Sequence, residues 1–445
     1  MEGFKDLIWS GDKIVWRNLL KHYLLCLDHA CILLTLNGSD TPINLASLPV
    51  LKTENDLPTQ DYKDAFKSAC DTFLNTPSVP ECAEGLASRQ RPIRRDELRW
   101  HLRILHWHAL NAIFTAYRER RIQLDASGGE MFRDLCAKMP VRPEVFGMTN
   151  EFEQRHTGVE GGSEQLYAAM NAIHQQGILI GKYNNPTSPA VRNSSLILAE
   201  FPDHYVKLVE KMIHPDWYMA CFTESYASPS MWGHYANAHK GVCLKFGIGV
   251  TSGKPTLTLN GIVGRRDSKT DPAGQPAFSH TNHPLYKVAY KATYPETDFF
   301  RSLGQLRGTA LRWWYSDALG KNSSCARDVF ENEAAWGEKY RGEFLEGQTT
   351  KLQDWAYEEE YRLVLSDSLT DYAEDKGLAL KYEFSDLKGI IFGINTPEED
   401  KVAIIRVVQT KCAKENRSEF EFLQAYYAKR TGKKIDAAQL SLIRF

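Results

Sequence analysis

The sequence predicts an α+β protein with a large helical elaboration at its N-terminal end. The first observation is that apolar residues recur at three- and four-residue spacing near the start of the chain, as they do in amphipathic helices. These runs cover residues 13–36, 61–74 and 96–122. The second is that residues 217–246 have the pattern of a strand, a loop, a short helix and another strand. The third is that short strand patterns return at residues 361–365 and 378–394.

We therefore expect a mainly helical region over residues 1–160 and an α+β core over residues 161–445. Within the core, residues 251–283 are rich in Gly, Pro, Ser, Thr and Asn, which predicts a long surface loop. Residues 297–347 are predicted as a helical insertion. The remaining expected elements are helices at 163–175, 202–213 and 397–410, and strands at 177–183, 285–294 and 420–429.

Composition narrows the class of protein before any motif is considered. The chain has 445 residues, of which 43% are hydrophobic and 25% charged, as in globular proteins that dissolve in water. Its formal net charge is −2, so the overall charge does not by itself indicate a nucleic-acid or membrane partner. Nine dispersed cysteines without a CxxC pair argue against a zinc ribbon or a disulfide scaffold. With no secretory signal and no apolar run long enough to span a bilayer, we expect a cytoplasmic protein.

The stretch 217–246 concentrates residue types that bind ligands. Residues 218–222 are predicted as a buried strand, Pro229 fits a first helical turn, and Gly241 is placed to end the helix expected over 231–240. A polar strand end that leads into a helix is a common place for an anionic or nucleotide ligand. The alternative is a packed helix whose Trp and Tyr fill the core. The crowded residues are Thr223, Glu224, Ser228, Ser230, Trp232, His234, Tyr235, His239 and Lys240.

A second informative stretch, residues 349–367, places three carboxylates at the entrance of a strand. Because neighbouring strand residues point to opposite faces, Glu358 and Glu360 are expected on one side and Glu359 on the other. A carboxylate fixed there can stabilise a developing cation or orient a ribose hydroxyl. The alternative is a solvated acidic turn that pairs with Lys351 and Arg362.

Two further patterns are weighed against simpler explanations. The helix over 96–122 carries many arginines with few acids between them, so it offers either a basic face for phosphates or a solvated helix face. The spacing of His22, Cys26 and His29 fits helix surface and core better than a metal site, because no further ligand stands at a workable distance. We predict no resident metal.

Three separated motifs resemble the bacterial domain of unknown function 2971 family. They are CFTE at 221–224, SMWGHYANAHKGVCLKF at 230–246 and TTKLQDWAYEEEYRLV at 349–364, and residues 287–290 suit the V-Y strand of that family. The resemblance spans roughly residues 217–394. It names a family and leaves the function open.

The order of elements also resembles, more loosely, the DarT-like ADP-ribosyltransferases, which modify nucleic acid in toxin–antitoxin and phage-defence systems. This resemblance implies a split mixed sheet, NAD as the cofactor and Glu360 as the catalytic carboxylate. It further implies a macromolecular acceptor, nucleic acid or protein, a partner antitoxin or defence protein, and no membrane. The residues that it places along the dinucleotide are Phe222, Thr223, Glu224, Ser230, Met231, Trp232, His234 and Tyr235.

Two departures keep other functions open. The family usually begins with a strand bearing a K-Y-R-like motif, whereas residues 1–4 of this chain resemble the tail of the segment that follows it. The arginine of the DarT-like loop also has no counterpart between Thr223 and Met231. The missing first strand favours a catalytically inactive nucleotide-binding or sensing module. A third hypothesis, a metal-dependent hydrolase using His234, His239 and Glu224, is disfavoured because five-residue spacing separates the two histidines on a helix.

Overall fold

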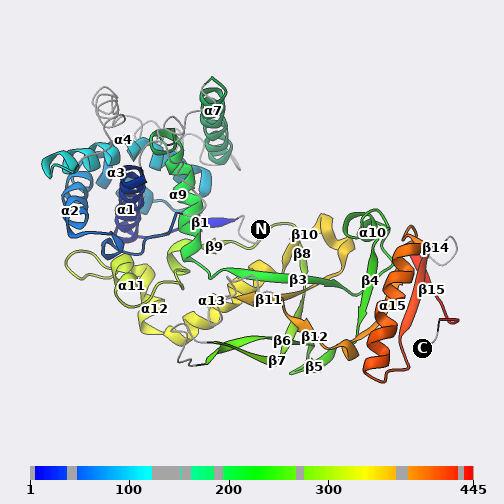
Figure 1. Cartoon of the computed structure of the whole chain (residues 1–445). Coiled ribbons are helices and arrows are strands. Elements are labelled where there is room, and N and C mark those ends of the chain that lie inside the picture. The colour runs from blue at the N-terminus through cyan, green and yellow to red at the C-terminus, as the bar shows by residue number, and fades with distance from the viewer. Residues whose placement is uncertain are drawn as a thin grey trace. The chain divides into compact units, whose positions relative to one another are not determined.

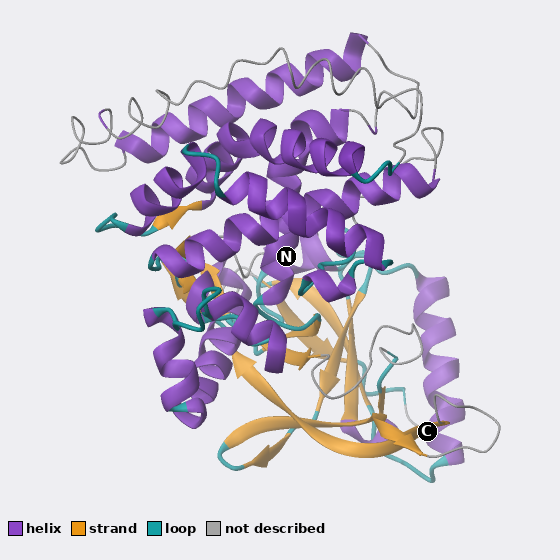
Figure 2. Ribbon diagram, turned by 90° about the vertical axis from the view of Figure 1, so that its left-hand side faces the viewer, coloured by secondary structure: helices purple, strands orange, loops and turns teal. Residues whose placement is uncertain are grey.

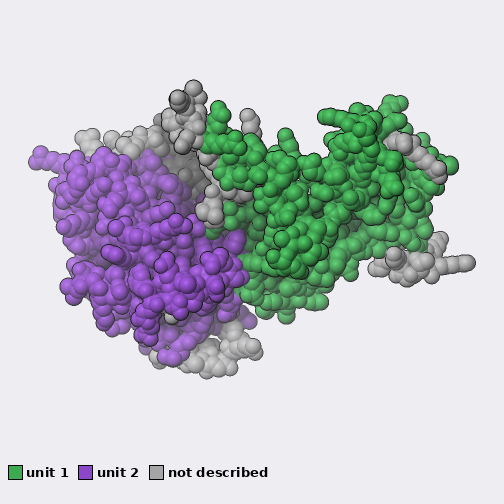
Figure 3. Space-filling model, turned by 90° about the horizontal axis from the view of Figure 1, so that it is seen from below, with its two compact units in different colours: residues 1–5, 215–295, 345–445 green, residues 6–214, 296–344 purple. Residues whose placement is uncertain are grey.

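The computed structural model describes residues 6–37, 48–122, 151, 162–184, 193, 195–266, 275–366, 379–428 and 435–443. The chain divides into two compact units, which are coloured separately in Figure 3. The helical unit comprises residues 6–214 and 296–344, and the sheet unit comprises residues 1–5, 215–295 and 345–445. Each unit is described by itself. The division expected from the sequence, at residues 160 and 161, stays a prediction.

The helical unit is built around a buried helix, α1 (Lys13–Asn37), whose predicted apolar face is enclosed along most of its length. Trp16 and Tyr23 of this helix are fully buried, and so are Trp9 and Trp314 of the same core cluster. A small sheet in the order β2-β1-β9 lies in the same unit. Its strands are β1 (Leu7–Trp9), β2 (Ile93–Arg94) and β9 (Thr297–Asp298).

The other helices of this unit are α2 (Gln60–Leu74), α3 (Ser78–Ala87), α4 (Arg95–Glu119), α7 (Gly162–Asn184), α9 (Phe201–Val209), α11 (Gly308–Tyr315) and α12 (Arg327–Glu331). Among them, α2, α4 and α9 agree with expected runs, α3 was not expected, and α7 extends beyond its expected end (Figures 1 and 2). Helix α13 (Glu333–Gln348) crosses the division between the units. The expected helical insertion over 297–347 is thus made of several short helices and one longer one.

The sheet unit contains a curled, largely antiparallel sheet in the order β12-β6-β7-β11-β3, with β5 paired to β6. A second sheet has the order β15-β14-β13-β4, and β10 pairs with β8. The first sheet contains β3 (Trp217–Thr223), β5 (Gly249–Thr251), β6 (Lys254–Arg266), β7 (Gln275–Lys287), β11 (Glu360–Ser366) and β12 (Lys381–Tyr382). The other elements are α10 (Pro229–Tyr235), β4 (Val242–Phe246), β8 (Ala289–Lys291), β10 (Thr350–Leu352), β13 (Leu387–Phe392), α15 (Glu398–Lys414), β14 (Glu421–Tyr427) and β15 (Ile435–Gln439).

The strand register gives the first sheet two chemically distinct faces. Glu360 pairs with Thr223, and Arg362 pairs with Cys221 on one side and Tyr286 on the other. Because paired residues share a face and neighbours alternate, these side chains define one face, which we call the charged face. The opposite face carries an apolar cluster that includes Leu257, Leu259, Leu285 and Leu363. We call it the apolar face.

The mixture of helices and sheets confirms the predicted α+β class, and three expected elements need correction. Residues 251–283 were expected to form a loop, but most of their described part belongs to the paired strands β6 and β7. The strict alternation of Thr and Leu at 256–259 satisfies a two-sided strand and outweighs the turn-forming composition. The expected strand 177–183 is the second half of α7. Gly177 and Gly181 lie within this helix with open space beside them, and the helix forms despite the low helix propensity of glycine. The strand at 420–429 is not the last, because β15 follows it.

Candidate functional site

The stretch 217–246 forms the expected strand, loop, helix and strand, but residues 218–222 are half-buried or exposed instead of buried, and the helix is shorter than predicted. Pro229 occupies the first turn of α10 and Ser228 precedes it with extended backbone. Helix α10 ends at Tyr235 instead of Lys240. The reason is the backbone that follows, because Asn237, Ala238 and His239 have φ angles of 46°, 53° and 67°.

This left-handed turn is held by the loop after β13. The amide of Asn395 donates to the carbonyl of His239 at 3.0 Å, and the Thr396 hydroxyl donates to the carbonyl of Gly241 at 3.0 Å. A Cβ at Gly393 would lie 2.2 Å from the carbonyl oxygen of His239, so this close approach requires glycine. Left-handed backbone costs roughly 1–2 kcal/mol for each residue other than glycine, and such strain gathers at functional sites.

A buried cluster of opposite charges lies at the entrance of β11. The ammonium of Lys351 contacts Glu358 at 2.5 Å and Glu360 at 3.1 Å. Both oxygens of Glu360 also accept from Arg362, whose Nε and NH2 atoms lie 3.0 and 3.1 Å away. Glu358 is 1% exposed and Glu360 4% exposed. We call Lys351, Glu358, Glu360 and Arg362 the charge cluster.

The surroundings of Glu360 keep it ionised. Burial alone would raise its pKa, but hydrogen bonds and charge from Arg362, Cys221 and Lys351 outweigh burial and hold the pKa below its usual value. In turn, Glu358 and Glu360 raise the pKa of Lys351, against the effect of burial. The backbone of Glu360 is equally fixed, because its amide donates to the Tyr290 hydroxyl at 2.9 Å and its carbonyl accepts from Val288.

The charge cluster is joined to α10 by a tyrosine. The Tyr235 hydroxyl donates to Glu358 Oε1 at 2.9 Å, although 65% of the Tyr235 side chain is exposed. Burial of the hydroxyl and its bond to Glu358 raise the pKa of Tyr235 to about 12. The ring of His234 lies 6.5 Å from that of Tyr235 and 6.4 Å from that of Tyr357, centroid to centroid.

Two more residues, Trp355 and Tyr357, extend this row of ring contacts beside the charge cluster. The rings of Trp355 and Tyr357 are 6.1 Å apart, and the Lys351 ammonium lies 5.2 Å from the centre of the Trp355 ring. We call His234, Tyr235, Trp355 and Tyr357 the aromatic rim. Planar rings beside a fixed polar network can stack on a flat ligand while hydroxyl and imidazole groups bond its polar edge.

The structure brings together part of the residue set expected around the dinucleotide. Thr223 lies on the charged face beside Glu360, and its hydroxyl donates to the carbonyl of Glu358 at 2.9 Å. His234 and Tyr235 are exposed in the aromatic rim. Ser230 is exposed and Met231 half-buried, on the helix that carries these two residues.

Other residues of that set lie apart from Glu360. Phe222 pairs with Tyr361 and therefore lies on the apolar face. Glu224 binds Lys287 at 3.2 Å and accepts from the Tyr361 hydroxyl at 3.2 Å. Trp232 is 3% exposed, and its indole N–H donates to the carbonyl of Tyr226 at 2.7 Å.

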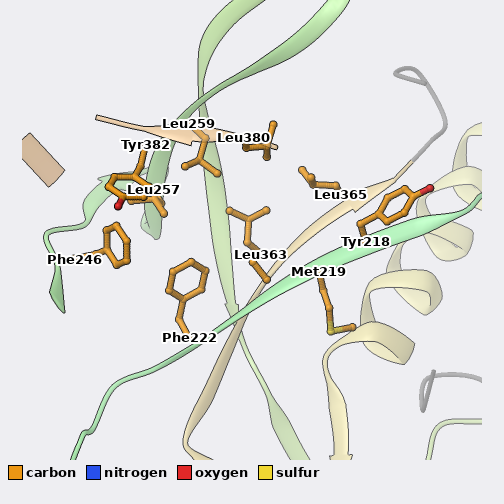
Figure 4. Close-up of a pocket in the computed structure, with 11 residues that line it drawn as sticks. Tyr218, Met219, Phe222, Phe246, Leu257, Leu259, Leu363, Leu365, Leu380 and Tyr382 are labelled. Atoms are coloured by element: carbon orange, nitrogen blue, oxygen red, sulfur yellow. The ribbon is translucent and has the colours of Figure 1, made fainter. Parts of the chain in front are cut away.

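A pocket of about 420 Å³ lies on the apolar face, away from the charge cluster. Figure 4 shows the side chains of Phe222, Phe246, Leu257 and Leu363 among those directed into it. Its lining contains no charged side chain. The pocket therefore differs from the polar cleft that the sequence predicts beside Glu360.

The arginine-rich helix is largely engaged in internal ion pairs. On α4 and just before it, Arg91 pairs with Glu97, Arg95 with Glu210, and Arg103 with Asp203. These side chains are therefore not free to form the phosphate-binding face that the sequence allowed. Within the described ranges, no group of three or more His, Cys, Asp or Glu side chains is arranged to hold a metal ion.

Sequence reasoning found the carboxylates and the pairing with Lys351 and Arg362, but not their burial. It also missed Tyr290, Trp355 and Tyr357. Tyr357 stands directly before the three glutamates and Tyr290 belongs to the V-Y motif, so their positions in the sequence were the available signal. Their convergence depends on the pairing of β8 with β10 and of β11 with β3 and β7, which no local pattern reveals.

The fold and the site define an α+β protein in which exposed aromatic rings cover a buried cluster of carboxylates and cations. Residues 231–363 match the model of a family described as "Protein of unknown function (DUF2971)", which supports the resemblance noted in the sequence. No curated protein and no solved structure matches the chain. Of the helices in the described ranges, none is both long enough and apolar enough to cross a membrane.

Proposed function

We propose that the sheet unit binds a nucleotide at the aromatic rim and that the chain acts as a nucleotide-binding or sensing module, with NAD as the first ligand to test. The observation that carries this proposal is the pairing of Glu360. Its carboxylate is 4% exposed and both of its oxygens accept hydrogen bonds from Arg362. A carboxylate held in this way fixes the positions of the groups around it, and it is not free to bind a ribose hydroxyl.

The aromatic rim supplies the contacts that a base or a nicotinamide ring requires. Stacking of a base on an aromatic side chain contributes roughly 1–3 kcal/mol. Tyr235 is held in place by its bond to Glu358, so little side-chain entropy is lost when a ligand stacks on it. His234 and the hydroxyl of Tyr357, which lie 3.4 Å apart, offer polar atoms at the same surface.

ADP-ribosyl transfer is the second candidate, and the position of Glu360 favours it. This residue is the first of β11, where the DarT-like resemblance implies the catalytic carboxylate, and its lowered pKa keeps it anionic. To act on NAD, Glu360 has to exchange a bond with Arg362 for one with the nicotinamide ribose. The carboxylate would then stabilise the oxocarbenium-like transition state as nicotinamide leaves. The nucleic-acid or protein acceptor, and a role in defence or toxin–antitoxin systems, follow from the resemblance alone.

One experiment separates the two candidates. The whole chain is mixed with NAD, binding is followed by saturation-transfer NMR, and free nicotinamide is measured by chromatography. The module predicts binding without nicotinamide release, and the Glu360→Gln variant is expected to retain binding if it folds. Nicotinamide release that disappears in Glu360→Gln would favour the transferase. Failure to bind NAD, AMP and ADP-ribose would overturn both.

A further inference from the structure

The hairpin formed by β6 and β7 is unlike the rest of the chain in its charge. Its two strands have 13 residues each and contain no Asp or Glu. Their basic residues lie on both faces: Lys254 shares the face of Tyr286, whereas Arg266 and Lys287 pair with Gln275 and Tyr361 on the apolar face. The formal net charge of the whole chain is −2. The excess of basic residues is therefore a property of this hairpin and not of the whole chain.

One face of the hairpin carries a row of polar side chains. Thr258 pairs with Asn282 and Asn260 pairs with His280, so all four share a face. The Thr258 hydroxyl donates to Asn282 Oδ1 at 2.8 Å, and the Asn260 amide lies 3.5 Å from His280 Nε2. We call these four residues the polar ladder.

Cations and aromatic rings flank the polar ladder on the same face. Lys381 of β12 pairs with Asn260, and the Lys254 ammonium lies 5.2 Å from the centre of the Tyr286 ring. Phe278 pairs with Ile262 next along the ladder, and 55% of its side chain is exposed. Both lysines are exposed as well. Asn, Thr and His side chains bond base edges, lysines bind phosphates, and an exposed Phe stacks on bases.

The polar ladder continues the charged face of the sheet. Tyr286 pairs with Arg362, so the face that bears Glu360 and Arg362 also bears Tyr286, Asn282 and His280. Phe278 to Tyr286 is a run of nine residues, whose eight steps span about 27 Å along an antiparallel strand. That length accommodates several nucleotides of a single strand.

We propose that this face of the β6–β7 hairpin is a docking surface for single-stranded nucleic acid. Charge complementarity selects the partner, since Lys254 and Lys381 lie on this face and neither β6 nor β7 has a carboxylate of its own. Glu383, on the neighbouring loop, pairs with His280 at 2.5 Å and opposes an approaching phosphate. The inference depends on the hairpin and the adjoining β12, and it holds whether or not the aromatic rim binds NAD.

The test is fluorescence anisotropy with labelled oligo-dT and oligo-U of about 12 nucleotides, a size within the range that single-strand binding folds cover. A duplex of the same length and a poly-glutamate peptide serve as competitors. The whole chain is expected to bind both single strands, with affinity that falls as salt rises, and to be displaced poorly by duplex or peptide. Failure to bind either strand, or equal displacement by poly-glutamate, would overturn the proposal.

Charge variants locate the surface. Lys254→Ala and Lys381→Ala together are expected to weaken binding severalfold and to reduce the log–log salt slope by about 1.4, since each lost phosphate contact contributes about 0.7 for single strands. The matched control removes the same charge from exposed lysines elsewhere, as Lys67→Ala and Lys414→Ala. Glu383→Gln is expected to strengthen binding severalfold. Equal losses in the two double variants, with both melting like the parent chain, would contradict the assignment.

Discussion

The hydroxyl of Tyr235 donates a hydrogen bond to Glu358 Oε1 over 2.9 Å, and this bond joins α10 to the entrance of β11 across 123 residues of sequence. On one side of it lies an exposed ring, and on the other lies the buried charge cluster. The bond therefore links the exposed ring directly to the buried carboxylates. Four of the predictions below concern this arrangement, its strain or the acid response of the helical unit, and the last tests the proposed ligand.

The first prediction concerns the tyrosine hydroxyl. Tyr235→Phe keeps the ring but removes one donor from buried Glu358, so we expect the free energy of unfolding to fall by about 1 kcal/mol. Urea unfolding followed by circular dichroism measures the change. Tyr427→Phe, at an exposed tyrosine of β14, is the control and should change stability little. An equal loss in both variants would show that the bond to Glu358 contributes nothing.

The second prediction concerns the cation between the two glutamates. Lys351→Met leaves Glu358 and Glu360 buried without their shared partner, and breaking such a pair costs roughly 3–5 kcal/mol. Adding Glu358→Gln removes one of the stranded charges and is expected to restore part of the loss. The comparison forms a double-mutant cycle in urea unfolding. Additive losses would mean that Lys351 and Glu358 are not coupled.

The third prediction concerns backbone strain. Ala238 and Glu359 have φ angles of 53° and 47°, so Ala238→Gly and Glu359→Gly are each expected to stabilise the chain by roughly 0.5–1 kcal/mol. The control is Lys67→Gly at an exposed position of α2, which should destabilise by about 1 kcal/mol. Thermal melting reports all three. If both site glycines destabilise, the turn geometry does not carry the assumed strain.

The fourth prediction concerns acid. Burial lowers the pKa of His22 and His106 to about 4, and of His101 and His214 to about 3. A histidine kept neutral in the folded state stabilises it fully above the ordinary value of 6.5 and less as pH falls toward the lowered value. We therefore expect the helical unit to lose stability between pH 6.5 and 4.

Four described carboxyl groups of the helical unit act in the opposite direction. Burial raises the pKa of Asp28 and Glu210 to about 7 and also raises the pKa of Asp6 and Asp298, so their contribution is lost as pH rises. Burial lowers the pKa of His29, His108 and His174 as well, so seven histidines against four carboxyls leave a net loss on acidification. Urea midpoints measured from pH 6.5 to 4 provide the test, and a flat or rising profile would contradict the burial of the histidines.

Local pattern was enough to predict much of the fold. The apolar spacing of α1, α2 and α4 identified these helices, because the residues that each helix buries recur at helical spacing. A short apolar run identified β3, and the stretch that follows the three glutamates identified β11. The β6–β7 hairpin was missed because Gly, Pro and Asn were weighed above the alternation of Thr and Leu. Strand 177–183 was wrongly predicted because the apolar Leu179 and Ile180 are exposed on α7, at 65% and 60%.

The candidate site was predictable only in its parts. Alternation placed Glu358 and Glu360 on one side, and both do contact Lys351. The sequence could not show that β11 lies between β3 and β7, and this pairing is what buries the carboxylates. For the same reason it could not separate Thr223 from Phe222, which are neighbours in sequence but lie on opposite faces of the sheet.

Calorimetric titration of the whole chain with NAD tests the central claim most directly, and the comparison is between the parent chain, Tyr235→Ala and Tyr427→Ala. If the aromatic rim is the binding site, NAD binds the parent and Tyr427→Ala alike, and Tyr235→Ala weakens binding about tenfold through the lost stacking contact. Equal NAD affinity in Tyr235→Ala and the parent would contradict the account, because the ligand would then bind away from the ring that is anchored to Glu358.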